Sequence, residues 1–300
     1  MRWTYLTPDA AVAEELRKEA GLSPLLARLL APRAVSKPAQ ADAFLSPSLS
    51  QLHSPYLMRG MHEAIERICA AIARQESTLI YGDYDVDGTT AVVILKTAIE
   101  LCGGTADFHV PHRIKEGYGI KDDVIERAAA AGVKLVISVD TGIRAFHAAD
   151  TARRVGVDLI VTDHHLPEAN EGVPDALAVL NPNQQGCDYP CKALCGAGVV
   201  FKIAQALFAR FKDEAEQGKL IPSFLKMVAM ATIADAVPLV DENRVMARLG
   251  LEGLRRPVNG GLKALMEVSG LAGLGRALSA GDVGFRLAGG GYAEIFAGGG

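Results

Sequence analysis

The chain has 300 residues, a net charge of −4 at pH 7 and 49% hydrophobic residues. This length suits one large domain or two ordinary ones, with ample apolar side chains for a core. The mild negative charge does not indicate a nucleic-acid binder, but it excludes none, because acidic metal ligands can lower the total while a local basic groove remains. No apolar signal sequence opens the chain and no run approaches the ~18 apolar residues of a membrane span, so we expect a soluble, cytoplasmic protein without a membrane partner.

The five cysteines are an odd number, which favours reduced thiols over a disulfide framework. Cys187, Cys191 and Cys195 recur every four residues. Metal-binding cysteines more often occur as pairs with two residues between them. We therefore expect ordinary thiols here, with a metal or iron–sulfur site as the alternative.

The predicted elements change character along the chain. Residues 1 to about 50 have apolar side chains at helical spacing, broken by prolines, which indicates a small helical N-terminal subdomain. Beyond a linking loop, strands and helices alternate, and repeated β-α-β units predict an α/β fold with a mostly parallel sheet and helices on both faces. The C-terminal part is again helical in pattern. Helices are expected at 61–74, 89–101, 121–131, 144–155, 198–211, 223–234 and 244–254, and strands at 78–81, 106–110, 135–139, 159–161 and 176–180.

An acidic turn follows the first predicted strand. Asp83, Asp85 and Asp87 occupy alternate positions just after Tyr81. Three like charges within five residues repel one another, and a folded state must offset this with cations, hydrogen-bond donors or water. Parallel α/β sheets bind ligands at the carboxyl ends of their strands. A divalent cation that prefers oxygen ligands, such as Mg²⁺, Mn²⁺ or Ca²⁺, is therefore expected at this turn.

Three further segments end in side chains that can bind metal: Asp140, then Asp163 with His164 and His165, then Asp235. Each alone has a structural explanation: Asp140 could be a helix cap, the two histidines a solvent-facing or structural pair, and Asp235 a turn residue. Because parallel strands bring their carboxyl ends to one edge, these residues can converge with the acidic turn. Carboxylates that bridge two cations, together with imidazoles, predict a dinuclear phosphoester or phosphoanhydride hydrolase. The imidazoles favour Mn²⁺ over Mg²⁺.

Four ordered segments resemble the motifs of the DHH phosphoesterase superfamily: Asp83–Gly88, Val139–Gly142, Asp163–His165 and Ala231–Asp235. Other segments are similar to its RecJ branch, the bacterial single-strand-specific DNA exonucleases. Among them are Pro111-His112-Arg113, Glu116–Gly119, Asn181-Pro182-Asn183, Gly196–Val199 and Asp235–Leu239. The resemblance runs from about residue 20 to 288.

The resemblance implies a role for each motif residue. Asp140 resembles the bridging aspartate, His165 a histidine that contacts metal or the scissile phosphate, and Asp163 a residue that orients the histidines. The implied metal ligands are Asp85, Asp87, Asp140, His164, His165 and Asp235.

Four more residues have open roles. Asp83 acts either at the site directly or structurally. Arg113 and Lys115 are candidate phosphate contacts, with plain surface charge as the alternative. Tyr118 is a candidate for stacking on a base, with a core or hinge role as the alternative.

For the whole chain, the resemblance implies a metal-dependent phosphodiesterase that uses two Mn²⁺ or Mg²⁺ ions. It would be a single-stranded-DNA-specific 5′→3′ exonuclease releasing 5′-mononucleotides in DNA repair and recombination, with a single-strand-binding protein or helicase as candidate partner. The alternatives are a DHH enzyme acting on short oligonucleotides, cyclic dinucleotides or pyrophosphate, and a catalytically inactive binding fragment. We expect a helical subdomain at 1–50, the DHH catalytic domain at 51–255, the start of a connection to an absent second domain at 256–288, and a glycine-rich tail or linker at 289–300.

Overall fold

The computed structural model describes residues 7–33, 35–168, 172–256 and 260–291. Within them, five strands form one sheet in the order β2-β1-β3-β4-β5, and every neighbouring pair is parallel. The prediction of a parallel α/β sheet is thus confirmed. The strands are β1 (Thr78–Tyr81), β2 (Ala106–His109), β3 (Leu135–Val139), β4 (Asp158–Thr162) and β5 (Ala178–Leu180).

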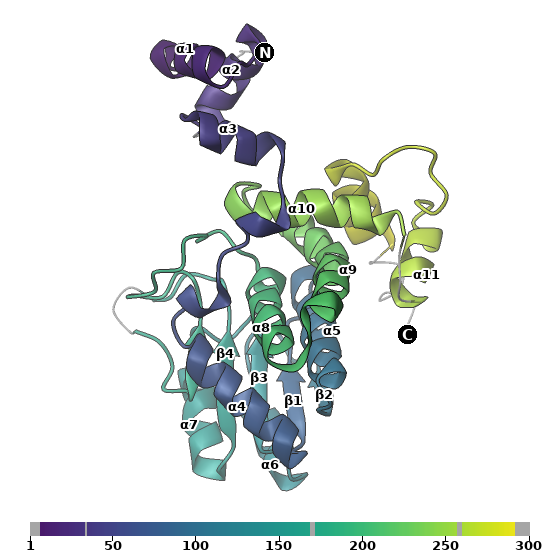
Figure 1. Ribbon diagram of the computed structural model, residues 1–300. Coiled ribbons are helices and arrows are strands. Elements are labelled where there is room, and N and C mark those ends of the chain that lie inside the picture. The colour runs from purple at the N-terminus through teal and green to yellow at the C-terminus, as the bar shows by residue number, and fades with distance from the viewer. Residues whose placement is uncertain (1–6, 34, 169–171, 257–259, 292–300) are drawn as a thin grey trace.

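Side chains alternate between the two faces of the sheet, and helices cover both (Figure 1). Ile80 and Ile137 face one core, while their neighbours Tyr81 and Val136 face the other. A strand buried on both faces must be apolar throughout, which is why Leu135–Val139 reads as a continuous hydrophobic run. The first core is covered by α4 (Met61–Arg74), α5 (Val86–Leu101) and α8 (Gly196–Phe211), the second by α6 (Asp122–Ala130) and α7 (Phe146–Val155).

Two long helices, α9 (Glu214–Ala234) and α10 (Asp241–Leu254), extend the first layer. The ring of Phe224 in α9 packs edge-on against Phe208 of α8, with 5.0 Å between centroids. The predicted start of this helix at residue 223 is wrong. Pro222 lies inside the helix, and the preceding turns are stabilised by a capping box in which Asp213 and Glu216 bond each other's backbone amides. An interior proline removes a backbone donor and crowds the carbonyl four residues earlier, so α9 continues through Pro222 because capping and packing offset that cost.

The N-terminal helices α1 (Ala10–Glu19), α2 (Pro24–Leu30) and α3 (Pro38–Leu45) enclose a small core of their own around Leu16 and Leu30. They lie away from the sheet, at the top of Figure 1. Arg244 of α10 connects them to the rest, because its guanidinium lies 3.5 Å from the ring centroid of Phe44 and donates a hydrogen bond to that residue's carbonyl. The predicted helical character of this region is borne out.

A buried ion pair links α8 to α10. Lys202 Nζ lies 2.7 Å from Glu242 Oε2, and both side chains are fully buried. Lys202 also donates to the His53 carbonyl at 3.0 Å, and Tyr189 donates its hydroxyl hydrogen to Glu242. Buried charges are tolerated when they are paired and hydrogen-bonded. The network therefore fixes the start of α10 against the body of the chain.

The C-terminal segment folds against α9 and α10. Helix α11 (Gly260–Val268) and a π-helix, η4 (Asp282–Gly291), form a third core around Met230, Leu254 and Leu265. Much of 256–288, expected to begin a connection, is thus packed structure. The glycines at the start of the expected tail complete η4, and residues 292–300 lie outside the described part of the chain. Among the described residues, no helix is long and apolar enough to span a membrane.

Candidate metal centre

The order of the strands places a ligand site between β1 and β3. These two strands are neighbours, while β2 lies on the far side of β1 and β4 on the far side of β3. Chain connections therefore leave β1 and β3 in opposite directions, which opens a crevice at their carboxyl ends, where open α/β sheets bind ligands. The acidic turn follows β1 and Asp140 follows β3.

The acidic turn is the beginning of α5. This helix starts at Val86, not at Thr89 as predicted, because Asp85 caps it: its Oδ1 accepts a hydrogen bond from Gly88 N at 2.9 Å. Asp87 consequently lies in the first helical turn and is buried, whereas Asp85 is exposed. Asp83 is also buried, and a Cβ added to Gly88 would lie 2.7 Å from its Cβ. Only glycine therefore allows α5 to start so close to Asp83.

The N-terminus of α8 holds the carboxylate of Asp87. Gly196 N donates to Oδ2 at 2.6 Å and Ala197 N to Oδ1 at 2.8 Å. Amides at a helix N-terminus favour a negative charge, and hydrogen bonds to ionised groups are the stronger kind. Sequence reasoning missed this contact. Gly196–Val199 carries a signal, glycine and alanine at a helix start, but no spacing rule pairs it with a residue so distant.

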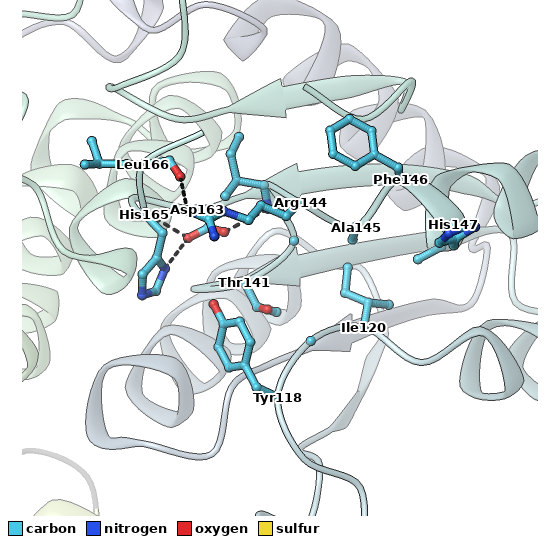
Figure 2. A pocket seen from close by; sticks show the side chains of 14 residues that line it. Tyr118, Ile120, Thr141, Arg144, Ala145, Phe146, His147, Asp163, His165 and Leu166 are labelled. Carbon is cyan, nitrogen blue, oxygen red and sulfur yellow. Dashed lines mark hydrogen bonds and ion pairs between the residues drawn. The ribbon is translucent and has the colours of Figure 1, made fainter. Parts of the chain in front are cut away.

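Asp163 organises the loop after β4. The fully buried carboxylate accepts a hydrogen bond from His165 Nδ1 at 2.7 Å (Figure 2). It accepts another from Ile143 N at 2.9 Å. Burial alone would raise the pKa of Asp163, but these bonds and the neighbouring imidazole bring it below its ordinary value. The hydrogen bond that His165 donates to Asp163 in turn raises the pKa of His165. Asp163 therefore contacts the ring of one of the two histidines, and its orienting role stays a prediction.

Two asparagines fix the main chain of the same loop. Asn181 Nδ2 donates to the His165 carbonyl and Asn183 Nδ2 to the His164 carbonyl, each at 2.8 Å. Asn181-Pro182-Asn183 is one of the segments similar to the RecJ branch, but its sequence predicted no such contacts. These amides position both histidines without contacting the imidazole rings.

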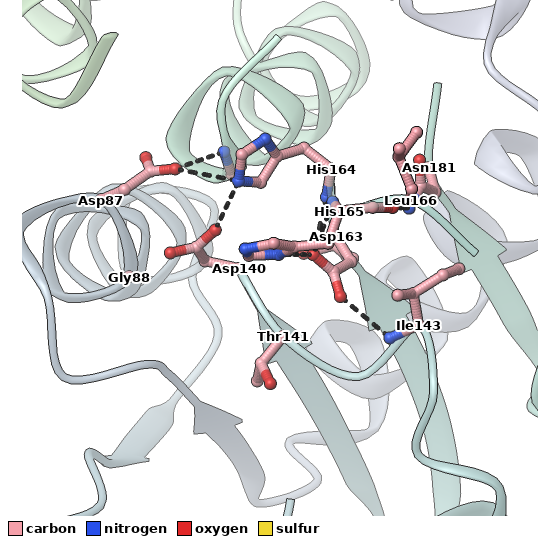
Figure 3. Close-up of polar contacts among 12 residues, drawn as sticks. Asp87, Gly88, Asp140, Thr141, Ile143, Asp163, His164, His165, Leu166 and Asn181 are labelled. Atoms are coloured by element: carbon pink, nitrogen blue, oxygen red, sulfur yellow. Dashed lines mark hydrogen bonds and ion pairs between the residues drawn. The ribbon is translucent and has the colours of Figure 1, made fainter. Parts of the chain in front are cut away.

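The carboxylates converge on His164. Its Nε2 lies 3.2 Å from Asp140 Oδ1 and 3.8 Å from Asp87 Oδ2 (Figure 3). Asp235 Oδ2 also lies 3.8 Å from this nitrogen. Among the described residues, three overlapping groups have ligand atoms within 4.8 Å of one another. They are Asp140, His164 and His165; Asp87, His164 and Asp235; and Asp83, Asp85 and Asp140. The structure thus brings together every residue predicted to bind metal.

The electrostatics of these groups fit a cation. Burial, followed by the charge of neighbouring carboxylates, raises the pKa of Asp140 well above its ordinary value. The same two causes, in the same order, raise the pKa of Asp235 to about 6. Asp140 adopts a left-handed backbone with φ of 59°, and its buried Oδ1 accepts no hydrogen bond from any described residue. A buried carboxylate oxygen without a donor, amid like charges, is an apt ligand for a divalent ion.

Asn243 of α10 connects two parts of the site. Its Nδ2 donates to the Ala193 carbonyl at 2.5 Å and to the Pro238 carbonyl at 3.1 Å. Ala193 precedes the α8 turn that holds Asp87, and Pro238 follows Asp235, which ends α9. This fully buried side chain therefore fixes the spacing of two ligand-bearing segments. Sequence reasoning gave no sign of it.

The predicted substrate residues lie at different places. Tyr118 is beside the site, with its ring edge-on to His165 at 6.1 Å between centroids. Arg113 stacks over the ring of Tyr84 in the acidic turn, 5.1 Å from its centroid. Lys115 is exposed. The three closely spaced cysteines are buried free thiols, and none belongs to the three ligand groups found in the described residues.

Fold and site together define an α/β protein with a buried carboxylate–histidine metal centre at the switch point of its sheet. The family model described as "DHH family, N-terminal domain" matches residues 77–232, which include the first three motifs and the first two residues of the fourth. The chain belongs to the DHH family.

Relatives with curated descriptions are similar over most of this chain. The single-stranded-DNA-specific exonuclease RecJ of Bacillus subtilis is 42% identical over 96% of the chain, and that of Dickeya dadantii is 38% identical over 89%. The chain spans only 35% and 46% of those proteins, respectively. A crystal structure of RecJ from Thermus thermophilus with Mn²⁺ matches with a TM-score of 0.76 at 26% identity, over 96% of this chain and 39% of that one. A structure of exonuclease RecJ bound to manganese matches with a TM-score of 0.69 at 30% identity, over 80% of this chain and 57% of that one.

Proposed function

We propose that the chain is the catalytic part of a metal-dependent, single-stranded-DNA-specific exonuclease that digests from the 5′ end and releases 5′-mononucleotides. The buried Oδ1 of Asp140 carries this proposal, because it accepts no hydrogen bond from a described residue and faces Nε2 of His164, 3.2 Å away, among carboxylates that need a cation. The likeness to proteins described as single-stranded-DNA-specific exonucleases supports the substrate. The polarity is what the motif resemblance implies. Action on DNA in repair and recombination, and location in the cytoplasm, belong to the same proposal.

Two divalent ions, Mn²⁺ or Mg²⁺, fit the ligand groups. Asp87, His164 and Asp235 would hold one ion, and Asp140 with Asp83 and Asp85 would hold the other. Bound ions would supply an acidified water molecule and neutralise charge on the phosphoryl oxygens. RecJ from Thermus thermophilus has been crystallised with each of these metals.

The residues of the chain have distinct tasks in this proposal. Asp163 engages Nδ1 of His165, which leaves Nε2 of this half-exposed ring free to donate a hydrogen bond to a phosphoryl oxygen. The raised pKa of His165 keeps that donor protonated more of the time near neutral pH. Asn181 and Asn183 hold the loop so that the two rings keep their separation.

The test is cleavage of 5′-labelled single strands, duplexes, dinucleotides, cyclic dinucleotides and pyrophosphate by the 300-residue chain with and without Mn²⁺. We expect Mn²⁺-dependent release of mononucleotides from single strands. Asp140→Ala should abolish cleavage and weaken Mn²⁺ binding, whereas Asp107→Ala, which removes an exposed carboxylate from β2, should change neither. Cleavage of only the dinucleotides, cyclic dinucleotides or pyrophosphate would favour a DHH enzyme that acts on such small substrates. Mn²⁺ binding without any cleavage would favour an inactive fragment, and unchanged Mn²⁺ binding in Asp140→Ala would contradict the site.

Partners other than DNA are a separate part of the proposal. A single-strand-binding protein or a helicase would present the substrate strand. Pull-down of such a protein by the purified chain, in the absence of DNA, is the measurement that checks it.

A further inference from the structure

A cavity of about 390 Å³ lies between the N-terminal subdomain and the start of α10. One wall comes from α3 and from a short 3₁₀ helix, η1 (Ala31–Arg33), and the other from the first turn of α10 (Figure 1). The volume falls within the ~300–1,000 Å³ that ligand sites typically enclose. None of its lining residues belongs to the three metal-ligand groups, so the space is separate from the metal centre.

Two arginines line this cavity, and no carboxylate of a described residue forms an ion pair with either. Arg33 Nη1 donates to the carbonyl of Leu29, and Arg244 Nε donates to that of Phe44. Burial, followed by the like charge of Arg248, lowers the pKa of Arg244. A partly buried cation without a counterion is stabilised by any anion that enters the cavity.

The other polar side chains of the lining add a donor but no free acceptor charge. Gln40 Oε1 accepts hydrogen bonds from Ser36 N at 2.9 Å and Lys37 N at 3.1 Å, which leaves Nε2 as a donor. Asp241, the one carboxylate among the described lining residues, contacts His53 Nε2 through both oxygens, at 2.9 Å and 3.0 Å. Two guanidinium groups and an amide donor suit a ligand that only accepts hydrogen bonds, and guanidinium matches the oxygens of a phosphate in geometry.

The chain between the cavity and the metal centre is short. Val240 lines the cavity, and the predicted metal ligand Asp235 lies five residues before it. Five residues span at most ~18 Å. A strand of a duplex carries one phosphate every ~3.4 Å, so about six nucleotides cover this distance even at such close spacing. A strand whose end lies at the metal centre is therefore long enough to reach the cavity.

We propose that this cavity binds a phosphodiester of the substrate strand, several nucleotides from the end at the metal centre. This inference rests on the proposed function, which itself needs only the terminal nucleotide to be held. Contacts to phosphate position a strand without reading its sequence, so the cavity should act alike on every sequence. The N-terminal subdomain then provides a second contact for long strands, and strands that end before it gain nothing from the cavity.

The probes are a trinucleotide and a dodecanucleotide of thymidine, each with a 5′-phosphate and a 3′ fluorophore. Fluorescence anisotropy gives their dissociation constants from the 300-residue chain over a range of salt, in EDTA to prevent cleavage. Arg33→Gln removes one cation, and Ala43→Glu adds a carboxylate to the lining at an exposed position of α3. Ala39→Glu is the matched control, because it adds the same charge at an exposed position of the same helix outside the lining.

We expect the first two variants to bind the dodecanucleotide about tenfold more weakly, the effect of losing one charge-assisted hydrogen bond. In Arg33→Gln, the slope of log K against log salt should also become shallower by ~0.7, as for one lost phosphate contact on a single strand. Trinucleotide affinity should stay at the wild-type value in all variants, and Ala39→Glu should bind both probes as wild type does.

Three results would overturn the cavity assignment. They are unchanged dodecanucleotide affinity in Arg33→Gln and Ala43→Glu, an equal loss for the trinucleotide or in Ala39→Glu, and a wild-type chain that binds the dodecanucleotide no more tightly than the trinucleotide. Mn²⁺-dependent cleavage by the same samples tests the proposed function separately. A wild-type chain that cleaves no strand with Mn²⁺ would refute that function, whereas the pattern of binding losses alone decides the cavity.

Discussion

Gly196→Ala tests how the metal centre is assembled. A Cβ at this position would lie 2.5 Å from Asp140 Oδ1 and 2.6 Å from Asp140 Cβ, too close for the buried carboxylate to stay. Overpacking of this kind costs ~1–3 kcal/mol, and losing one amide hydrogen bond to the charged Asp87 costs ~1.5–3 kcal/mol. With Mn²⁺ bound, we expect the free energy of unfolding to fall by about 4 kcal/mol.

The loss should be smaller without metal. Moving Asp140 away from Asp87 relieves part of the carboxylate repulsion, so we expect a fall of about 2 kcal/mol in EDTA. The stabilisation that Mn²⁺ gives wild type, about 2.7 kcal/mol at one hundred times its dissociation constant, should shrink accordingly in the variant.

Urea unfolding with Mn²⁺ and with EDTA measures both quantities, and calorimetry measures Mn²⁺ affinity directly. Gly218→Ala is the matched control, because this glycine lies in α9 with open space around its position. Alanine is the better helix former, so the control should be unchanged or more stable by up to ~1 kcal/mol. A Gly196→Ala chain that binds Mn²⁺ like wild type and unfolds at the same urea concentration would refute the reasoning.

Three further predictions address other parts of the structure. Glu242→Leu should lower the free energy of unfolding by ~3–5 kcal/mol in urea melts, because it leaves the buried Lys202 without its partner. The double variant with Lys202→Met should recover most of this loss. An equal loss in the single and the double variant would contradict the reasoning. Asn243→Ala should weaken Mn²⁺ binding about tenfold in calorimetry, because it frees both segments that carry metal ligands. Residues that position metal ligands typically have effects of this size. Unchanged Mn²⁺ affinity in the variant would mean that packing alone sets the spacing of the two segments. Folding raises the pKa of Asp235 from 3.8 to about 6, so this residue stabilises the metal-free fold below about pH 4 and loses that contribution as the pH rises through 6. In EDTA, the stability of wild type relative to Asp235→Asn should therefore fall between pH 4 and pH 7, and a difference that does not change with pH would refute the shift.

Local patterns were enough for most of the fold. The helix at 61–74 and the strands at 78–81 and 135–139 lie at the predicted residues. Their apolar spacing reports directly on burial on one helix face or on both faces of a strand. Two of the errors fall where a side chain or a proline alters a helix end. Asp85 caps α5 three residues earlier than expected, and α9 continues through Pro222.

The sequence predicted which residues form the candidate site but not the hydrogen bonds that hold them in place. Asp140, His164 and Asp235 follow from residue type at the end of an element, together with the family likeness. The contacts that hold them do not follow, because hydrogen bonds between residues far apart in the chain leave no periodic trace. The amides of Gly196 and Ala197 on Asp87 are the plainest case.

The sequence by itself determined that carboxylates and imidazoles end several elements of a parallel α/β fold, because alternating apolar runs specify strands and helices locally. Only the tertiary structure decided which atoms meet. It brought Asp140 beside His164, fitted Gly196 closely against that carboxylate, and left a cavity between the N-terminal subdomain and α10. These outcomes depend on strand order and on packing between distant segments, which are long-range properties. A pattern of neighbouring residues contains no information about them.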